Sequence, residues 1–419
     1  MRILHCADLH IDSPLRGLSR YEGFPADEVR GATRRAVRNL VRYAVDPVNR
    51  IDVVTVGGDV FDGSWESADS GLWWNQQLGD LAEAGIEVFV VHGNHDADSK
   101  ITARITPPAG VHVFGSDAPT TVEATRCNLV VHGQSYARTA VHDDLGSGYP
   151  AAVPGSFNMG LLHTSLDGRP GHAPYAPCTA ADLALKGYEI WGLGHIHQRD
   201  DRIEVGGSRF VFPGNTQGRS IRETGAKGAT VITVDDRGSG LSVEFVPFYV
   251  VRWTLARVDI GPLDSLDAVV HEVERRVREE GVDGHTIAVR VELVGAGRLH
   301  DELGDSLGRL ETQLRATVST LGGVSAGLER VIDTTTPVSG VGADSEAERV
   351  LRDYVRRAVE DPAVFDELVD VLRPAAQRLR PYRDRLLEEE WPGAIDSPEV
   401  VREHLDAALD LLLARLRGA

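Results

Sequence analysis

The stretch Ile51-Asp-Val-Val-Thr-Val-Gly-Gly-Asp-Val-Phe-Asp62 joins a short run of mainly β-branched residues to a pair of glycines and two carboxylates. A short apolar run of this composition predicts a buried β-strand over Ile51–Val56. Gly57 and Gly58 permit the backbone angles of a tight turn, so the strand ends here and Asp59 follows at its tip. The stretch therefore predicts a strand that carries functional polar side chains at its end.

Other short apolar runs alternate with helical patterns through roughly the first 250 residues. We expect further strands at Ile3–Ala7, Ile86–Val91, Val111–Phe114, Leu129–His132, Met159–His163, Ile190–Leu193, Phe210–Phe212, Thr230–Val234 and Val243–Phe248. Helical spacing links Val29, Ala36, Val37, Leu40 and Ala44, and a second helix is expected over Leu72–Ala84. This interleaving predicts an α/β core with two packed sheets and helices outside them.

The pattern changes after about residue 250, where strands and helices alternate in the order βαβαβ. The expected elements are Arg252–Asp259, Leu263–Glu279, Thr286–Val294, Leu303–Val318 and Leu328–Asp333. The stretch Ser339-Gly-Val-Gly-Ala-Asp344 has the composition of a linker. Helix starts with a proline follow at Asp361-Pro362 and Ser397-Pro398. We therefore divide the chain into residues 1–250, a small βαβαβ domain at 251–338 and a helical segment at 339–419.

The composition is that of a soluble globular protein, with 42% hydrophobic and 26% charged residues, and 419 residues suggest two or three domains. We expect no signal peptide, because Met1 leads almost directly into an apolar strand. We expect no membrane span, because no run of about 18 apolar residues occurs. The three scattered cysteines, Cys6, Cys127 and Cys178, suit a reducing compartment. Together these features indicate a cytoplasmic protein.

The net charge of −19 argues against non-specific binding to nucleic acid, which depends on Lys and Arg. Bound metal ions would offset part of this charge, and a local basic track can coexist with an acidic chain. Residues 343–419 carry 18 acidic and 12 basic side chains, so we do not expect this tail to bind DNA. Its apolar stripes favour docking on another helix; they comprise Phe365, Leu368, Val369 and Leu372, and then Val401, Leu405, Ala408, Leu412 and Leu416.

Five short motifs at the ends of predicted strands contain residue types that bind metals. They are Asp8-x-His10, Gly58-Asp59-x-x-Asp62, Gly93-Asn94-His95-Asp96, the lone His163, and Gly194-His195-x-His197. Residues two apart in a strand point the same way, so Asp8 and His10 can reach one ion together. The carboxylate of Asp59 can bridge two ions. Two cations about 3.5–4 Å apart neutralise a phosphodiester and activate water, so the set predicts phosphoester cleavage.

The remaining motif residues fit supporting roles. Asn94 offers an uncharged amide oxygen, and His95 beside it can hydrogen-bond the substrate. Asp62 and Asp96 can orient neighbouring ligands or the imidazole of His95. Mixed carboxylate and imidazole ligands suit Mn²⁺, Fe and Zn²⁺, and Mg²⁺ less well.

In this order, over residues 8–197, the five motifs resemble those of the calcineurin-like metallophosphoesterases. Within that family the chain is similar to the DNA-repair exonuclease branch of SbcD-like proteins, and in particular to its YhaO-type members. The stretches that suggest this narrower resemblance are Leu162–Gly168, His172–Cys178, Pro213–Ser220 and Ile221–Gly225. It covers roughly residues 1–250, whereas the later regions match the family's capping and ATPase-binding regions only in layout.

The resemblance implies a four-layer α/β/β/α sandwich with a smaller βαβαβ capping domain and a C-terminal helical segment. It assigns Asp8, His10, Asp59 and His197 to a first metal ion. It assigns Asp59, Asn94, His163 and His195 to a second. His95 would stabilise or protonate the leaving oxygen, with Asp62 and Asp96 in support. The cofactors expected are two divalent metal ions, with Mn²⁺ favoured over Fe, Zn²⁺ and Mg²⁺.

Several other residues can be interpreted either as structural or as functional. His5, His92, His112 and His132 follow or interrupt apolar runs and are expected to be structural, whereas His172 and Tyr175 either line the cleft or pack near it. Arg30, Arg34, Arg38 and Arg42 share a helical face, which favours a solvated surface over a phosphate track. Arg219, Arg222 and Lys227 are candidates for phosphate contact. Trp65, Trp73 and Trp74 most simply pack a helix, although the resemblance implies a homodimer there.

These observations predict a metal-dependent DNA nuclease, most simply an exonuclease in DNA repair. DNA and an SMC-like coiled-coil ATPase are the expected partners, and the apolar stripes of the tail would bind the ATPase. One alternative is a phosphatase or cyclic-nucleotide phosphodiesterase that acts on small substrates, because the same metals serve both. Another is a scaffold that binds DNA ends and for which hydrolysis is secondary.

Overall fold

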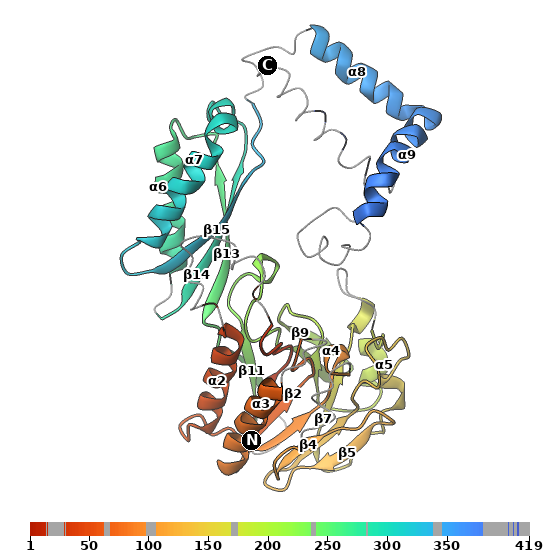
Figure 1. Cartoon of the computed structure of the whole chain (residues 1–419). Coiled ribbons are helices and arrows are strands. Elements are labelled where there is room, and N and C mark those ends of the chain that lie inside the picture. The colour runs from red at the N-terminus through yellow and green to blue at the C-terminus, as the bar shows by residue number, and fades with distance from the viewer. Residues whose placement is uncertain are drawn as a thin grey trace. The chain divides into compact units, whose positions relative to one another are not determined.

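The computed structural model describes residues 1–13, 15, 29, 31–62, 68–97, 106–168, 175–235, 240–281, 284–337 and 346–379, together with positions 401, 405 and 409. The chain forms two compact units, Met1–Pro337 and Val338–Ala419 (Figure 1). The first unit contains two six-stranded sheets and one three-stranded sheet among its described residues. The second unit contains the helices α8 (Glu346–Glu360) and α9 (Pro362–Leu379) among its described residues.

The first six-stranded sheet has the order β12-β11-β1-β2-β3-β4. Its four parallel strands are β1 (Arg2–Cys6), β2 (Val53–Val56), β3 (Glu87–Val90) and β4 (Val111–Val113). The strands β11 (Gly228–Val234) and β12 (Leu241–Pro247) extend it in antiparallel pairing. The chain thus returns to the first strand after completing the second sheet.

The second six-stranded sheet has the order β5-β6-β7-β8-β10-β9. Its central strands β6 (Leu129–Gly133), β7 (Phe157–His163), β8 (Ile190–Gly194) and β10 (Ser208–Phe212) are parallel. The strands β5 (Thr120–Glu123) and β9 (Asp200–Val205) pair antiparallel to them at the two edges. The edge strand β5 is largely exposed and β9 is only partly buried, whereas every residue of β7 and β8 is buried.

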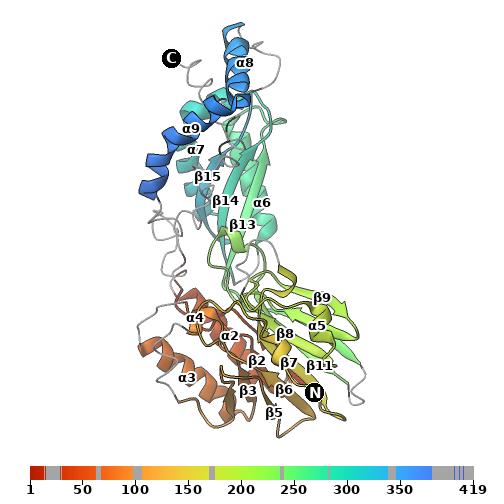
Figure 2. The same cartoon turned by 90° about the vertical axis from the view of Figure 1, so that its right-hand side faces the viewer.

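Alternating side chains place the two sheets face to face. Ile3 and Val53 point toward Met159 of the second sheet, whereas Leu4 and Val54 belong to a separate core cluster on the other face. That outer face is covered by α2 (Ala32–Val45) and α3 (Ala68–Glu83). The short α5 (Ala180–Ala184) packs on the far side of the second sheet. Figure 1 shows α2 and α3 on one side of the two sheets and α5 on the other, and Figure 2 views them from the side of α5; the layers form the expected α/β/β/α sandwich.

The helix α2 illustrates how sequence pattern produces this packing. Ala36, Val37, Leu40 and Ala44 are each at most 3% exposed and lie on one helical stripe against the first sheet. Full burial of a side chain such as Leu40 contributes about 1.5–3 kcal/mol. Val29 was expected in the same helix, but Gly31 at φ 69° precedes the helix start at Ala32.

The third sheet, β13-β14-β15, is wholly parallel and consists of β13 (Val251–Asp259), β14 (Thr286–Val294) and β15 (Ser325–Asp333). The helices α6 (Leu266–Glu280) and α7 (Leu299–Ser319) connect these strands and pack on one face of the sheet (Figure 1). On the other face Trp253 is 1% exposed and packs with Val251 and Ile221. Because Ile221 belongs to the loop before β11, this small cluster connects the third sheet to the sandwich.

The second unit contains α8 (Glu346–Glu360) and α9 (Pro362–Leu379). Asp361 precedes α9 and its side chain accepts a hydrogen bond from the backbone N–H of Ala363 at 2.9 Å. Phe365, Val369 and Val401 form a small buried cluster. Three parts of the sequence prediction for this unit lie outside the described residues: the expected linker Ser339–Asp344, the helix start at Ser397-Pro398, and the stripe residues Ala408, Leu412 and Leu416.

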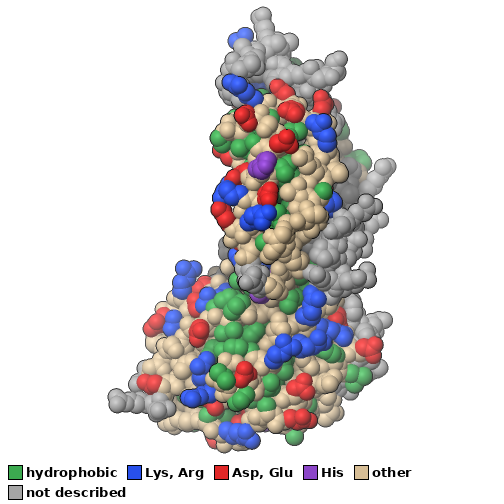
Figure 3. Space-filling model, turned by 90° about the vertical axis from the view of Figure 1, so that its left-hand side faces the viewer, with side chains coloured by type: hydrophobic (Ala, Val, Ile, Leu, Met, Phe, Trp, Pro, Cys, Tyr) green, Lys and Arg blue, Asp and Glu red, His purple; other side chains and the backbone are tan. Residues whose placement is uncertain are grey.

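Surface charge is distributed unevenly. On the face in Figure 3, Lys and Arg side chains surround an area of hydrophobic side chains in the lower body, which contains the two six-stranded sheets. Basic side chains therefore gather locally although the whole chain carries a net charge of −19. Among the described helices, none combines the length and apolar character that a membrane crossing requires.

Candidate metal centre

The loops that follow β1, β2, β3, β7 and β8 meet at one edge of the sandwich, because these strands are parallel and end on the same side. The short α4 (Asn94–Ala97) follows β3 at this edge. The two sheets are joined here directly: His163 Nδ1 lies 2.8 Å from the carbonyl oxygen of Gly57. All five sequence motifs therefore reach one region of the molecule.

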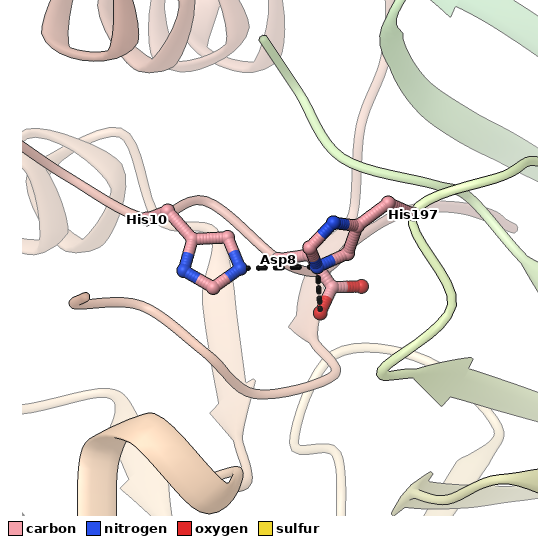
Figure 4. Close-up of side chains that lie close together, drawn as sticks. All are labelled: Asp8, His10 and His197. Atoms are coloured by element: carbon pink, nitrogen blue, oxygen red, sulfur yellow. Dashed lines mark hydrogen bonds and ion pairs between the residues drawn. The ribbon is translucent and has the colours of Figure 1, made fainter. Parts of the chain in front are cut away.

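Asp8, His10 and His197 form the first group of potential ligands (Figure 4). The Nε2 atoms of His10 and His197 lie 3.1 Å apart, and His197 Nε2 lies 3.7 Å from Asp8 Oδ1. One ligand atom from each residue falls within 4.8 Å of the others. Two imidazole nitrogens and a carboxylate that converge in this way can share one cation.

Asp59 connects this group to the others. Its Oδ2 atom lies 3.5 Å from His163 Nε2 and 4.0 Å from the Nε2 atoms of both His10 and His95. It belongs to two further groups, His10–Asp59–His95 and Asp8–Asp59–His163. A carboxylate shared between neighbouring donor groups is the arrangement that a bridging ligand of two cations requires.

Asn94 and His195 lie next to His163. Asn94 Oδ1 is 3.0 Å from His163 Nε2, and the rings of His163 and His195 have centroids 5.2 Å apart. The backbone N–H of His195 donates to both carboxylate oxygens of Asp8 at 3.1 Å. The structure thus brings together all seven residues predicted as metal ligands.

The backbone at this edge is unusual. Asp8, His10, Asp59 and His195 all have positive φ, at 51°, 42°, 52° and 96°. Non-glycine residues rarely adopt such angles, and they concentrate at functional sites. Four such residues in one centre indicate that these loops adopt unfavourable backbone angles in order to position the potential ligands.

Gly93 shows how tightly the ligands are packed. A Cβ atom at this position would lie 2.2 Å from Asp59 Oδ1 and 2.7 Å from His163 Cε1. Gly58, at φ 99°, would place a Cβ atom 2.7 Å from His163 Nδ1. Only glycine leaves room for the carboxylate and imidazole at these two points.

The buried carboxylates of Asp8 and Asp59 require positive charge nearby in order to remain ionised. Burial raises the pKa of Asp8, so its ionised form needs a cation close by. Burial also opposes ionisation of Asp59, but His163 and its neighbouring imidazoles hold the pKa of Asp59 well below its usual range. Burial would lower the pKa of His163, yet Asp59 and Asp8 raise it to about 9. A divalent cation would supply this positive charge in place of the proton.

His10 has the opposite electrostatic environment. Burial, together with the nearby Arg219 guanidinium, lowers the pKa of His10 to about 3. The imidazole therefore stays neutral and keeps a lone pair for a metal. The mixture of neutral imidazole, amide and carboxylate oxygen fits first-row divalent ions such as Mn²⁺, Fe²⁺ or Zn²⁺.

The two supporting carboxylates have different surroundings. Asp62 Oδ1 lies 3.5 Å from His10 Nδ1 and 3.6 Å from His95 Nδ1. Asp96 instead accepts hydrogen bonds from the backbone N–H groups of Val60, Phe61 and Gly93 at 3.0–3.2 Å. Asp62 is thus the carboxylate beside the His95 ring, whereas Asp96 fastens the loop after β2 to the turn before α4.

One buried carboxylate in this region was missed in the sequence. Glu223 Oε1 lies 2.7 Å from His197 Nδ1. Burial opposes its ionisation, but Arg219 and His197 hold the pKa of Glu223 well below its usual range. Its only signal in the sequence is its place in Arg222-Glu-Thr-Gly225, four residues after Arg219.

The predicted substrate-binding residues lie in different places. Arg219 is near the centre, with Nη1 3.5 Å from Asp62 Oδ1, whereas Arg222 is exposed. Lys227 is buried, and its Nζ donates to the carbonyl oxygen of His197 at 3.1 Å. The Tyr175 ring is half-buried, with its centroid 5.8 Å from that of His195. His172 lies outside the described residues.

The other residues weighed in the sequence are placed as follows. His5 is fully buried between Thr55 Oγ1 and the carbonyl oxygen of Leu193. Arg34 donates to Asp12 and lies over the Trp73 ring at 5.2 Å. Trp73 and Trp74 pack against the core of the first sheet, while Arg30 and Trp65 lie outside the described residues.

Comparison with known proteins assigns this chain to a family. Residues 1–199 match the model of the calcineurin-like phosphoesterases, and residues 253–336 match the middle domain of metallophosphoesterase YhaO. The chain is 33% identical over 298 residues to "Uncharacterized metallophosphoesterase YhaO" of Bacillus subtilis, which covers 70% of this chain and 72% of that protein.

Two further relatives carry names from DNA metabolism. The chain is 23% identical over 309 residues to "DNA double-strand break repair protein Mre11" of Methanopyrus kandleri, covering 66% of this chain and 62% of that protein. It is 32% identical over 120 residues to a component of the nuclease SbcCD of Rhodobacter capsulatus, covering 28% of this chain and 27% of that protein. With the converging ligands and these matches, the chain belongs to the calcineurin-like metallophosphoesterases, hydrolases of phosphoesters that use a dinuclear metal centre.

Proposed function

We propose that this metallophosphoesterase is a Mn²⁺-dependent DNA nuclease, acting as an exonuclease in DNA repair with an SMC-like coiled-coil ATPase. The names of the Mre11 and SbcCD relatives support the choice of DNA as substrate. The observation that carries the proposal is the set of three donor groups, in which each pair of groups has one residue in common: Asp8, His10 or Asp59. Adjacent sites of this kind suit the cleavage of a phosphodiester, whose negative charge repels a nucleophile.

In this proposal Asp8, His10, Asp59 and His197 hold one ion. Asp59, Asn94, His163 and His195 hold the other. When bound, the two ions would neutralise the phosphate and make a coordinated water acidic enough to ionise near neutral pH. The burial of Asp8, Asp59 and His163 excludes bulk water from the ligands and so strengthens their electrostatic interactions.

We propose that His95 donates the proton to the leaving oxygen. Its side chain is 38% exposed, in contrast to the buried ligands around it. Its Nδ1 faces Asp62 at 3.6 Å and its Nε2 lies 4.0 Å from Asp59. Asp62 lies beside Nδ1 and orients the ring, so that Nε2 can donate a proton to the departing oxygen.

The proposal is tested with end-labelled single-stranded and duplex DNA. We expect degradation from an end with Mn²⁺ and none with EDTA, and Asp59→Asn to abolish it. The exposed Asp117→Asn is the matched control and should behave as the wild type. Hydrolysis of bis-p-nitrophenyl phosphate without any cleavage of DNA would instead indicate a small-substrate phosphodiesterase. DNA binding that persists in Asp59→Asn, with no cleavage by the wild type, would indicate a scaffold.

The helical unit supplies the proposed contact with the ATPase. In α8, Val350 and Tyr354 are 63% and 70% exposed and lie four residues apart, on one helical face. In α9, Val364 and Val371 are 43% and 70% exposed. Exposed apolar side chains at helical spacing suit docking on a helical partner, which supports a coiled coil as the surface bound.

A further inference from the structure

Glu223 belongs to the loop that joins β10 to β11. Four nitrogen atoms lie within hydrogen-bond distance of its carboxylate: His197 Nδ1 at 2.7 Å, Asn215 Nδ2 at 2.7 Å, the backbone N of Arg219 at 2.6 Å and Arg219 Nη2 at 3.0 Å. Its side chain is only 11% exposed. A buried carboxylate with this many donors is held in one orientation.

The other side of the same loop is fastened to β13 of the third sheet. Gln217 Oε1 accepts from the backbone N–H groups of Val250 and Val251, and its Nε2 donates to the carbonyl oxygen of Val251 at 2.7 Å. Trp253 Nε1 donates to the carbonyl oxygen of Gly218 at 3.0 Å. Because both sides of the loop are fixed, Glu223 cannot follow the His197 ring if that ring moves.

The contact between Glu223 and His197 determines which ring nitrogen can bind a metal. If Nδ1 carries the proton, it donates to Glu223 Oε1 and leaves the Nε2 lone pair directed at Asp8 and His10. Arg219 Nη2 lies 3.2 Å from the same Nδ1 and offers a competing arrangement, in which Nδ1 accepts and Nε2 keeps the proton. The 2.7 Å contact with a carboxylate that accepts but cannot donate favours the first arrangement.

We propose that Glu223 is a positioning residue that holds His197 with its proton on Nδ1 and its Nε2 toward the ion bound by Asp8 and His10. Arg219 then serves to keep Glu223 in place, and its guanidinium is engaged by Glu223 and Asp62. This inference rests on the assignment of His197 as a metal ligand and is independent of DNA as the substrate.

The test is a titration of the full-length, metal-free protein with Mn²⁺ in the absence of DNA. The electron paramagnetic resonance signal of free Mn²⁺ reports how much of the metal remains unbound. We expect two bound ions in the wild type. We expect Glu223→Gln to weaken one of them by about 10–100-fold and to leave the other unchanged. The matched control is Glu189→Gln, which removes a carboxylate that accepts from the Asn158 backbone N–H at the opposite end of β8. It should bind both ions normally.

A second measurement does not depend on the stability of the variant. Long-range ¹H–¹⁵N spectra of the metal-free wild type, with labelled histidine, should show His197 protonated at Nδ1; His197→Gln identifies the signal. A proton on Nε2 alone, or two tightly bound ions in a folded Glu223→Gln protein, would overturn the proposal. A wild type that binds no Mn²⁺ would overturn the metal centre itself, whereas failure to cleave DNA would affect only the proposed substrate.

Discussion

Replacement of Gly93 by alanine tests whether the close packing of Asp59 and His163 against this glycine is required for catalysis. The new Cβ atom would lie 2.2 Å from Asp59 Oδ1, whereas ordinary van der Waals contact begins at 3.4 Å, so the atoms must separate by about 1.2 Å. The same Cβ atom would lie 2.7 Å from His163 Cε1, so the carboxylate cannot relax freely on that side. A displacement of about 1 Å in a catalytic group costs on the order of 100-fold in rate.

The assay is hydrolysis of bis-p-nitrophenyl phosphate with saturating Mn²⁺, alongside thermal unfolding in EDTA. We expect Gly93→Ala to lower kcat/KM by on the order of 100-fold while the protein remains folded. The control is Gly79→Ala in α3, where the added Cβ meets nothing within 4 Å. It should keep full activity and gain about 0.5–1 kcal/mol in stability. Full activity of Gly93→Ala would show that the ligands are not confined as the structure indicates.

Three further predictions concern separate features. His95→Gln should lower kcat by about 10²–10⁴-fold with Mn²⁺ binding unchanged, as measured by titration, because His95 transfers a proton without being required as a ligand; a parallel loss of both would contradict this role. Burial lowers the pKa of His5 to about 4 from 6.5, so the unfolded chain binds the extra proton first as pH falls from 6.5 to 4. The unfolding free energy of the metal-free wild type, measured with urea, should therefore fall between pH 6.5 and 4 by up to about 1.4 kcal/mol per pH unit more than that of His5→Gln. The same dependence on pH in both proteins would refute the prediction. Val350→Glu with Tyr354→Glu should abolish co-purification with the proposed SMC-like ATPase while phosphodiester hydrolysis is retained, and unchanged co-purification would exclude α8 as the contact.

The sequence predicted the buried central strands, and also β12 and β13, whose side chains alternate between more and less exposed positions. The range Thr286–Val294 agrees with β14 residue for residue, because β-branched residues recur throughout it. The edge strands β5 and β9 were missed, since Thr120–Glu123 and Asp200–Val205 are mostly polar, contain no buried residue and are defined by their pairing with β6 and β10. Local pattern does not reveal a partner that lies elsewhere in the chain.

The site shows a similar division. Asp8, Asp59 and His163 could be named because each lies at or just after the end of a strong strand signal. The distinct surroundings of Asp62 and Asp96 could not be deduced, since both follow a ligand closely and only the turn geometry separates their partners. Glu223 was missed because its link to His197 spans 26 residues and has no fixed spacing to signal it.

The positive φ angles of Asp8, His10 and Asp59 bear on how this enzyme would respond to selection in the laboratory. Glycine or asparagine would accept these angles with less strain, so a screen that rewards heat resistance alone should favour such replacements. Each one would remove a carboxylate or an imidazole from the metal centre. Variants recovered for thermal tolerance without a demand for turnover are therefore expected to be sturdier and inert, and any useful screen must reward both properties together.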